Sequence, residues 1–356
     1  MTLEAHLLES PYDFPRTSDA SEVLAGLNRL GAHHYALCPG YRRIVDAMWG
    51  GEPALQVDRL EAVPYLPVSL FKRRWLSSVP DSDVTVTLTS SGTTGQQVSR
   101  IAVDAETSRR QQLALIRSMA HVLGKDRLPM LIADTASVIR DPALLSARGA
   151  GILGMMRLGR QPVFMLDRDQ RLDVRAIHAF LERYGHERFF VFGFTFIVWE
   201  LLRQAGDTLP LDLTRAVLVH SGGWKSMQDR AVDNTVFRAT LRERFGLHAV
   251  HNFYGMVEQI GTLFMEGDDG LLYPPSFANV VIRDPHSWAV CEPGQPGLVQ
   301  VQSLVPLSYP GHSLLTEDMG VIERFSDEGR FRGPGFRVLG RVPKVELRGC
   351  SDVMAA

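Results

Sequence analysis

A run of seven consecutive small residues, each a glycine or a hydroxyl-bearing side chain, follows a segment in which apolar and polar positions alternate. The run is Thr89, Ser90, Ser91, Gly92, Thr93, Thr94 and Gly95. The alternating residues 84–89 predict a strand, because successive side chains of a strand point to opposite faces. Glycine lets the backbone approach an anion closely, and hydroxyl groups add hydrogen-bond donors. The segment therefore predicts a phosphate-binding loop at the end of a strand.

This loop differs from the Walker type of phosphate loop, which ends in Gly-Lys-Ser/Thr and opens a helix. Here Gly95 is followed by Gln96, Gln97 and Val98, and then by a second apolar stretch at 101–103. A solvated turn rich in serine, threonine and glycine is the alternative interpretation, since such turns are common. Other motifs must decide between the two.

Further groups of glycine and polar residues lie in the second half of the chain, each close to an apolar segment. The first group follows the apolar residues 216–219 and is Ser221, Gly222, Gly223, Trp224 and Lys225. The second is Asn252, Phe253, Tyr254, Gly255, Met256, Val257 and Glu258. The third is Thr316, Glu317 and Asp318, with Gly340 and Arg341 after it. A glutamate suits a hard cation, because such cations prefer carboxylate oxygen.

In this order, the groups resemble the motifs of the adenylate-forming superfamily, which includes acyl-CoA synthetases, luciferases and the adenylation domains of peptide synthetases. The resemblance makes residues 89–95 the triphosphate loop, with Arg100 as the basic residue that follows it. It makes Ser221, Gly222 and Gly223 the floor on which adenine lies. Glycine fits that place, because a flat base needs bare backbone beneath it.

The same resemblance assigns roles to the aromatic-Gly-x-x-Glu group and to the Thr-Glu-Asp group. Asn252, Tyr254 and Gly255 belong to the adenine site, where the aromatic ring stacks on the base. Glu258 holds magnesium, and Asp318 accepts both hydroxyl groups of the ribose. A nucleotide site built from these residues is the implied function.

Arg341 and the residues after it bear on the catalytic cation. The resemblance gives Arg341 a contact with the nucleotide at a hinge, although Val342 stands where the hinge usually carries an acidic residue. The chain ends at residue 356, so we expect the C-terminal domain that carries a catalytic lysine in most members to be truncated. Lys225 and Arg341 are the candidates to replace that lysine.

The short length, the segment 220–225 and the ending 348–352 resemble the acyl-protein synthetases of bacterial luminescence. That family also includes proteins from antibiotic and phenazine clusters. In the luminescence enzymes, a cysteine close to the C-terminus takes the acyl group from the acyl adenylate. Cys350 matches this cysteine, and the neighbouring Arg348 would lower the pKa of its thiol.

The predicted reaction is activation of a fatty or aryl acid with ATP and magnesium to an acyl adenylate, followed by transfer of the acyl group to a thiol. One alternative passes the acyl group to an external acceptor, either a carrier protein, a reductase or an amine. Another is a non-catalytic homologue that only binds a nucleotide or a carboxylate. Single residues have structural alternatives too: a core aromatic for Tyr254, solvated acids for Glu258 and Asp318, a surface lysine for Lys225 and an incidental thiol for Cys350.

The composition narrows the class of protein. The chain has 356 residues, of which 45% are apolar, which is enough to bury a substantial core. Its net charge of -2 and its scattered arginines argue against a nucleic-acid partner. The N-terminus has no apolar segment of signal-peptide length, and no stretch approaches about eighteen apolar residues. We therefore expect neither export nor a membrane span.

The three cysteines, Cys38, Cys291 and Cys350, lie far apart in the sequence. They support neither a disulfide framework nor a Cys-x-x-Cys zinc site, and a reducing, cytoplasmic location fits them. His248 and His251 lack a matching acidic partner, so we expect them to be structural. Magnesium bound with the nucleotide is the metal that the sequence predicts.

The elements that must position these residues alternate in type, which predicts an α/β fold with sheets flanked by helices. By resemblance, this is the fold of the N-terminal domain of adenylate-forming enzymes. We expect a large domain at residues 1–340, with a helical lead-in at 1–80 and a β-rich subdomain at about 270–340. Residues 341–356 form a residual C-terminal arm with Cys350.

Periodicity places the individual elements. A helix capped by Asp104 should run to about His121, and helices are also expected at 19–60, 173–184, 195–205 and 226–245. Strands are expected at 130–133, 162–166, 189–192, 217–220 and 298–301. By resemblance, the acyl pocket lies between the glycine-containing apolar segments 149–156 and 191–196, although core packing explains their phenylalanines and methionines equally well.

Overall fold

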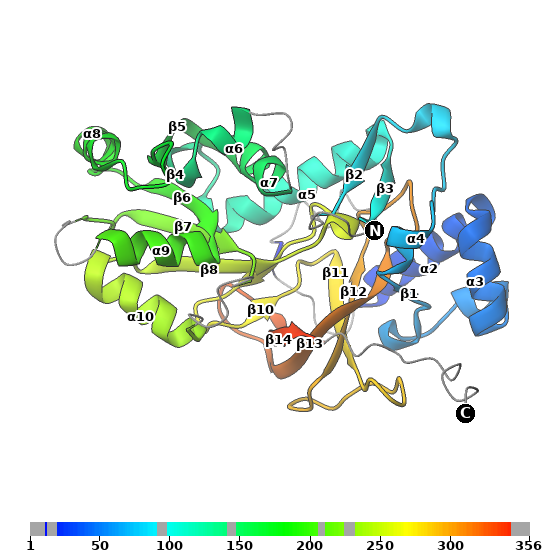
Figure 1. Ribbon diagram of the computed structural model, residues 1–356. Coiled ribbons are helices and arrows are strands. Elements are labelled where there is room, and N and C mark those ends of the chain that lie inside the picture. Colours follow the sequence, from blue (N-terminus) through cyan, green and yellow to red (C-terminus); the bar gives the residue numbers. More distant parts are fainter. Residues whose placement is uncertain are drawn as a thin grey trace, which may run out of the picture.

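Apolar segments that alternate with turns fold into one large mixed sheet with helices packed on its two faces (Figure 1). The computed structural model describes residues 11–12, 20–90, 98–140, 147–205, 211–223 and 232–342. The helices in these residues are α2 (Ala20–Leu37), α3 (Pro39–Trp49), α4 (Leu70–Arg73), α5 (Ala105–Leu123), α6 (Ser137–Arg140), α7 (Ala147–Met156), α8 (Val174–Tyr184), α9 (Thr195–Ala205) and α10 (Asn234–Phe245). Short 3-10 helices include η6 (Val257–Gln259).

The strands within the described residues are β1 (Leu66–Pro67), β2 (Val86–Thr89), β3 (Arg100–Val103), β4 (Leu128–Thr135), β5 (Gly159–Leu166), β6 (Phe189–Phe194), β7 (Ala216–Ser221), β8 (Ala249–Tyr254), β9 (Phe264–Glu266), β10 (Leu272–Tyr273), β11 (Ala278–Arg283), β12 (Gly297–Ser303), β13 (Ser313–Ser326) and β14 (Gly333–Arg341). The strands predicted at 130–133, 162–166, 189–192, 217–220 and 298–301 are present as β4, β5, β6, β7 and β12, each longer than predicted, whereas β2 is shorter than the predicted 84–89.

One half of the sheet is parallel, in the order β5-β4-β6-β7-β8. Its side chains alternate between two cores, as a strand requires. Leu131 and Leu218 pack with residues of α8, α9 and α10, whereas Ile132 and Val219 pack with residues of α5 and α7. Because both faces are covered, the strands are nearly continuous apolar runs, which is typical of parallel sheets.

Antiparallel strands continue the sheet from β8 through β9, β10, β14, β13 and β12 to β11. The stretch after residue 270 is rich in strands, and β9 joins it to the parallel half, because β9 pairs with β10, where Leu272 lies opposite Glu266, and with β8, where Met265 lies opposite Phe253. β1 pairs in parallel with β13, where Leu66 lies opposite Leu314. The strand that carries Asp318 is therefore bonded on both sides.

The helical lead-in is shorter than predicted. α3 begins with Pro39 and ends at Trp49, because Gly50 and Gly51 take left-handed φ angles of 82° and 93° and turn the chain. The following residues form only short 3-10 turns, at 52–55 and 60–62. The prediction of helix up to residue 60 is wrong beyond residue 49.

Aspartate caps set the start of the later helices. The carboxylate of Asp104 accepts a hydrogen bond of 2.8 Å from the backbone amide of Thr107, so α5 begins where the sequence predicted. α10 begins at Asn234 under a similar cap from Asp233. The sequence predicted that this helix begins at residue 226. Residues 224–231 lie outside the described residues.

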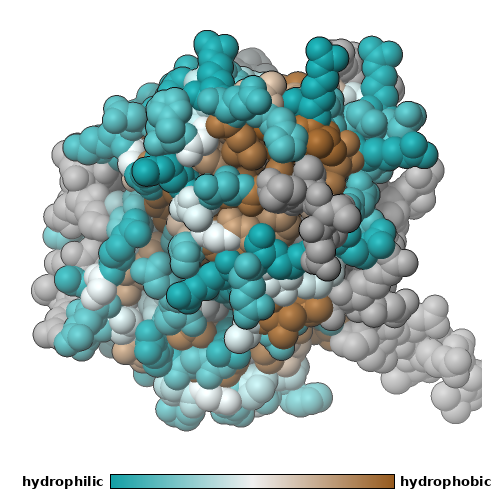
Figure 2. Space-filling view, turned by 90° about the vertical axis from the view of Figure 1, so that its left-hand side faces the viewer, coloured by the Kyte–Doolittle hydropathy of each residue, from teal (hydrophilic) through white to brown (hydrophobic). Residues whose placement is uncertain are grey.

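The hairpin of β2 and β3 lies apart from the large sheet, with Thr89 opposite Arg100 at the end that carries the predicted loop (Figure 1). Figure 2 shows the side of the molecule that carries α8, α9 and α10, where hydrophilic residues surround an area of apolar ones. No helix within the described residues is long and apolar enough to cross a membrane.

Candidate active site

Residues of the predicted adenine site lie where the parallel strands β7 and β8 end. Ser221 ends β7 and lies beside Phe253 of β8, whose carbonyl oxygen accepts a hydrogen bond of 2.9 Å from the Ser221 hydroxyl. Gly222 has a φ of 84°, a conformation that favours glycine. A Cβ added at Gly223 would meet no atom of the described residues within 4 Å, whereas one added at Gly222 would lie 3.3 Å from the Phe194 ring. The turn after β7 is thus bare backbone at the carboxyl edge of the sheet, where ligands of α/β proteins bind.

Tyr254, Asp318 and Arg341 come together although they belong to three different strands. The Tyr254 hydroxyl donates a hydrogen bond of 2.7 Å to Asp318 Oδ2. Asp318 and Arg341 are direct partners across β13 and β14, and Arg341 Nε lies 3.6 Å from Asp318 Oδ1. Three of the predicted nucleotide-binding residues therefore form one contact group.

The phenol of Tyr254 is held as a hydrogen-bond donor. Burial and the negative charge of Asp318 raise its pKa well above the ordinary value for tyrosine, so the hydroxyl keeps its proton. The ring of Tyr254 is half-buried and lies 6.1 Å from the ring of Phe264, centre to centre. The side chain is therefore fixed by contacts at both ends.

Glu258 lies in η6, directly after β8, and its residue is only 5% exposed. Neighbouring hydrogen bonds fix the backbone here: the Tyr309 hydroxyl donates to the Glu258 carbonyl oxygen at 2.9 Å, and Gln259 Nε2 donates to the Gly311 carbonyl oxygen at 2.8 Å. The backbone that carries the Glu258 carboxylate is therefore held in place.

Burial raises the pKa of the Glu258 carboxyl, because the charged form loses its hydration. The Ser99 hydroxyl and the charge of Lys72 counteract part of this rise, and the charge of Glu317 adds to it. Among the described residues, no lysine or arginine forms an ion pair with Glu258. A divalent cation at this carboxylate would supply the charge that the protein itself supplies only from a distance.

The base of the predicted phosphate loop lies beside Glu258. The Ser90 hydroxyl accepts a hydrogen bond of 2.9 Å from the Ser99 amide, and the Ser90 amide donates to the Ser99 carbonyl at 3.3 Å. The loop therefore leaves and re-enters the hairpin at two residues bonded to each other. Since Ser99 also acts on the pKa of Glu258, the loop base and the predicted magnesium ligand are neighbours.

Arg100 lies in the hairpin opposite Thr89, and its guanidinium carbon lies 6.0 Å from the centre of the Trp75 ring. Both residues are thus at the base of the predicted loop. The remaining loop residues, 91–95, lie outside the described residues, and so do Lys225 and Cys350. Their predicted roles stay predictions.

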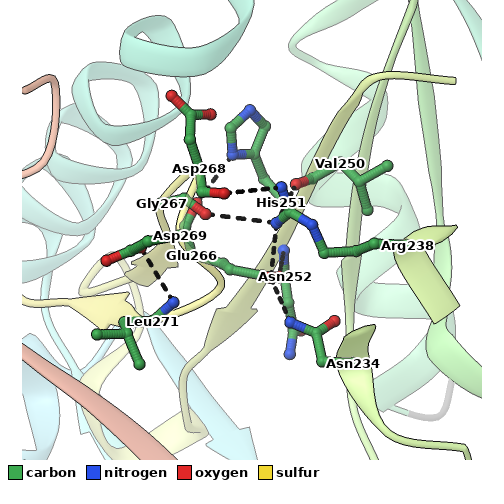
Figure 3. A network of polar contacts seen from close by, with 10 residues as sticks. All are labelled: Asn234, Arg238, Val250, His251, Asn252, Glu266, Gly267, Asp268, Asp269 and Leu271. Atoms are coloured by element: carbon green, nitrogen blue, oxygen red, sulfur yellow. Dashed lines mark hydrogen bonds and ion pairs between the residues drawn. The ribbon is translucent and has the colours of Figure 1, made fainter. Parts of the chain in front are cut away.

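Asn252 is engaged in a network of polar contacts with residues of α10 and β9 (Figure 3). Its backbone amide donates a hydrogen bond of 2.7 Å to Glu266 Oε2, and Arg238 donates one of 2.8 Å to Glu266 Oε1. Asn234 donates to Glu266 as well, and His251 Nδ1 bonds the Glu266 carbonyl oxygen at 2.8 Å. The side-chain oxygen of Asn252 is buried, with no hydrogen-bond partner among the described residues.

A surface pocket of about 650 Å³ borders this network and includes Arg238, Arg242 and His248. It lies at the first residues of β8, near Val250, whereas Tyr254 ends the same strand. The pocket is therefore separate from the residues that the motifs bring together. Among the described residues, no three histidine, cysteine, aspartate or glutamate side chains are placed to hold a metal ion.

Two features of this region have no signal in the sequence motifs. Lys72 of α4 lies 3.4 Å from a carboxylate oxygen of Glu317, next to Asp318 in the chain. Asp134, fully buried near the end of β4, receives two hydrogen bonds from Arg148 of α7, of 2.7 and 2.6 Å. In both cases the partners are far apart in sequence or lie on different elements, so only the fold reveals them.

Comparison with known proteins identifies sequence relatives along almost the whole chain. A family profile described as "Acyl-protein synthetase, LuxE" matches residues 5–356. A long-chain-fatty-acid–luciferin-component ligase of Vibrio harveyi is 24% identical over 337 residues, which cover 91% of this chain and 84% of the relative. The corresponding ligase of Aliivibrio fischeri is 23% identical over 314 residues, covering 83% of this chain and 79% of the relative.

Solved structures show the same architecture at low sequence identity. A 2-hydroxyisobutyryl-CoA ligase in the postadenylation state, in complex with 2-HIB-AMP, superposes with a TM-score of 0.70 at 16% identity, covering 93% of this chain and 70% of that chain. An open conformation of this ligase, in complex with 2-HIB-AMP and CoA, gives a TM-score of 0.69. The predicted fold class, that of adenylate-forming enzymes, is confirmed.

Proposed function

The chain belongs to the acyl-protein synthetase family and is a ligase with an adenylate-forming fold, and from this premise we propose that it activates a carboxylic acid with ATP and transfers the acyl group to a thiol. The observation that carries the proposal is the contact of Tyr254 with Asp318, 2.7 Å between hydroxyl and carboxylate, beside Arg341. It joins two motifs that are 64 residues apart in the chain, as a shared nucleotide site requires.

In the proposed complex, the ribose hydroxyls bind Asp318 and the adenine lies between Tyr254 and the bare turn at Gly222 and Gly223. The space beside Gly223 supports this placement, since no atom of the described residues lies within 4 Å of a Cβ added there. The triphosphate extends toward the hairpin loop at 89–95. Glu258 is the proposed magnesium ligand, because it is a buried carboxylate beside the loop base with a raised pKa and no ion pair within the described residues.

The proposed reaction has two steps, formation of the acyl adenylate and transfer of the acyl group. An oxygen of the substrate carboxylate attacks the α-phosphorus of ATP, the bond to the bridging oxygen breaks, and magnesium pyrophosphate leaves with that electron pair. A thiolate then attacks the carbonyl carbon of the acyl adenylate, forming a thioester and releasing AMP, while the thiol proton passes to solvent. Charge develops on phosphate oxygens in the first step, so positioned cations and backbone donors supply most of the acceleration.

We propose Cys350 as the thiol that accepts the acyl group. The two cysteines that the structure describes support this choice, since Cys38 is 2% exposed and Cys291 is 6% exposed. Burial raises the pKa of both thiols, which leaves little thiolate at neutral pH. A free thiol acceptor also fits a reducing, cytoplasmic location.

The substrate is proposed to be a fatty acid, because both curated relatives are named long-chain-fatty-acid ligases. The description of the matching family, acyl-protein synthetase, supports a protein as the final acceptor of the acyl group. Aryl acids belong in the same test, since the apolar residues of segments 149–156 and 191–196, where the acyl pocket is predicted, do not choose between the two classes.

Substrate-dependent exchange of labelled pyrophosphate into ATP tests the first step. Fatty acids of several chain lengths and a set of aryl acids should be compared, and we expect exchange with at least one fatty acid. Glu258→Gln should lower the exchange rate about 100-fold or more, whereas Asp318→Ala should chiefly raise the KM for ATP. Exchange by both variants at wild-type rates would refute the site, and wild-type protein without exchange for any acid would support a non-catalytic binder.

Labelling tests the second step. Wild-type protein incubated with ATP and a labelled acid should retain label after denaturation, and neutral hydroxylamine should release it. Cys350→Ser should keep exchange and lose the label, while Cys291→Ser, the matched control, should keep both. If Cys350→Ser retains the labile label, or if wild-type protein never acquires it, the acyl group goes to an external acceptor instead.

A further inference from the structure

Lys72 belongs to a short segment that lies between the β2–β3 hairpin and β13, the strand that carries Asp318. Its helix α4 follows β1, which pairs with β13, and the Val68 amide bonds the Leu315 carbonyl oxygen at 2.9 Å. On the other side, the Trp75 ring lies 6.0 Å from the guanidinium of Arg100 in β3. Figure 1 shows α4 beside β1 and the lower end of the hairpin. The position of Lys72 is thus set by both halves of the proposed nucleotide site.

The ammonium of Lys72 lies among carboxylates that would meet magnesium ATP. Its Nζ is 3.4 Å from Glu317 Oε2, and Glu317 directly precedes Asp318 in β13. Asp318 in turn accepts a hydrogen bond from Tyr254, which ends β8, and Glu258, the proposed metal ligand, lies in η6 shortly after β8. A divalent cation bound at Glu258 would repel this ammonium and favour its movement to an anion nearby.

The Lys72–Glu317 pair contributes little as a structural contact. The side chains are 33% and 38% exposed, and exposed ion pairs add little to stability because solvent screens them. The pair is joined by one contact of 3.4 Å between Lys72 Nζ and Glu317 Oε2, which is weaker than the two parallel hydrogen bonds of a bidentate pair. Lys72 is therefore free to exchange its partner at small cost when a phosphate arrives.

We propose that Lys72 binds the β- and γ-phosphates of ATP and stabilises the leaving pyrophosphate. Lys72 would then replace the catalytic lysine, a role for which the sequence suggested Lys225 or Arg341. This inference rests on the proposed function and specifies its phosphate contacts. Arg341 fits that role less well, because it lies 3.6 Å from Asp318, at the ribose end of the proposed site. A lysine acts here as a compact, mobile point charge that can follow the phosphate as negative charge moves to the leaving group.

Nucleotide selectivity distinguishes a phosphate contact from a structural role. Calorimetric titration of wild-type protein with ATP, ADP, AMP and adenosine, each with magnesium, gives the gain in affinity per phosphate. Lys72→Ala should raise the Kd of ATP about 10-fold or more and that of AMP less than about 2-fold. It should also slow pyrophosphate exchange about 100-fold, and Lys72→Arg should restore part of both properties.

Matched variants keep the result interpretable. Arg73→Ala removes the adjacent, exposed cation of the same helix and should leave the preference for ATP over AMP at its wild-type value. Glu317→Gln breaks the same ion pair but keeps the lysine, so it should not reproduce the selective loss. If Lys72→Ala weakens ATP and AMP equally, or weakens neither, or if Glu317→Gln copies its effect, the proposal is wrong.

The titration also separates this proposal from the function on which it rests. If no acid supports exchange, the proposed function fails, while the comparison of ATP with AMP can still be made. If wild-type protein exchanges pyrophosphate normally and Lys72→Ala does so at the same rate, only the role of Lys72 fails.

Discussion

Two buried glutamates lie close to β8 in the chain, Glu258 in η6 and Glu266 in β9, and their surroundings differ. Glu266 is 1% exposed, and its carboxylate accepts hydrogen bonds from Arg238, Asn234 and the Asn252 amide (Figure 3). Glu258 is 5% exposed, and within the described residues it has no ion pair. Lys72 acts on it from a distance, and burial raises its pKa.

The difference separates a structural carboxylate from one that is suited to a ligand. A buried charge that is paired and fully hydrogen-bonded holds elements together, and here it ties α10 to β8 and β9. A buried carboxylate without such partners carries a cost that a cation can remove on binding. Burial alone therefore does not identify an active-site acid, whereas the set of its partners does.

The largest expected effect is on stability at the structural member of the pair. Arg238→Ala leaves the charge of Glu266 buried without its cation, so the free energy of unfolding should fall by ~3 to 5 kcal/mol. Glu258→Gln removes a charge that burial disfavours, so it should not lower the free energy of unfolding. Urea denaturation followed by circular dichroism measures both.

The reverse result would break the comparison. A Glu258→Gln protein that is destabilised as much as Arg238→Ala would show that Glu258 is structural. Arg238→Lys, which keeps a charge but not the planar fork, should fall between wild type and the alanine variant.

A smaller effect, on nucleotide affinity, is expected when one of two tyrosines that each donate a hydrogen bond to an aspartate is replaced. The Tyr254 hydroxyl donates to Asp318 at 2.7 Å, and the Tyr273 hydroxyl donates to Asp269 at 2.6 Å. Tyr254→Phe removes the hydrogen bond that holds the Asp318 carboxylate, which is proposed to bind ribose. We therefore expect the Kd of ATP to rise about 10-fold, equivalent to about 1.4 kcal/mol. Tyr273→Phe should leave this Kd unchanged, and equal effects in the titration would refute a special role for the Tyr254 contact.

The smallest expected effect is a pH dependence that belongs to Glu258. Because its pKa is raised in the folded protein, the folded state binds the proton more tightly than the unfolded state. The resulting stabilisation is present below the ordinary glutamate pKa and is lost as the pH rises through the raised value. The difference in free energy of unfolding between wild type and Glu258→Gln should therefore shift against wild type as the pH rises above the ordinary glutamate pKa of about 4.5. Parallel curves for the two proteins over this range would contradict the raised pKa.

Local signals in the sequence predicted much of the fold. Asp104 predicted the start of α5, because an aspartate cap acts on the backbone a few residues away. The apolar runs at 189–192 and 217–220 predicted β6 and β7, because strands covered on both faces must be apolar throughout. The extent of the lead-in helix was wrong, since the left-handed turn at Gly50 and Gly51 outweighed the pattern around it.

What the sequence determined by itself is the identity of the candidate groups: the loop at 89–95, the turn at 221–223, Tyr254, Glu258 and Asp318. Each of these groups is a motif of residues that are adjacent in the sequence. The chemistry of such a group can therefore be predicted from the residue types alone. Only the tertiary structure decided that Tyr254 donates to Asp318 and that Lys72 lies beside Glu317 at a separation of 245 residues. It also decided that Glu266 has an ion pair with Arg238, whereas Glu258 has none within the described residues. Such contacts depend on which strands pair and in what register, and pairing between distant segments leaves no local pattern in the chain.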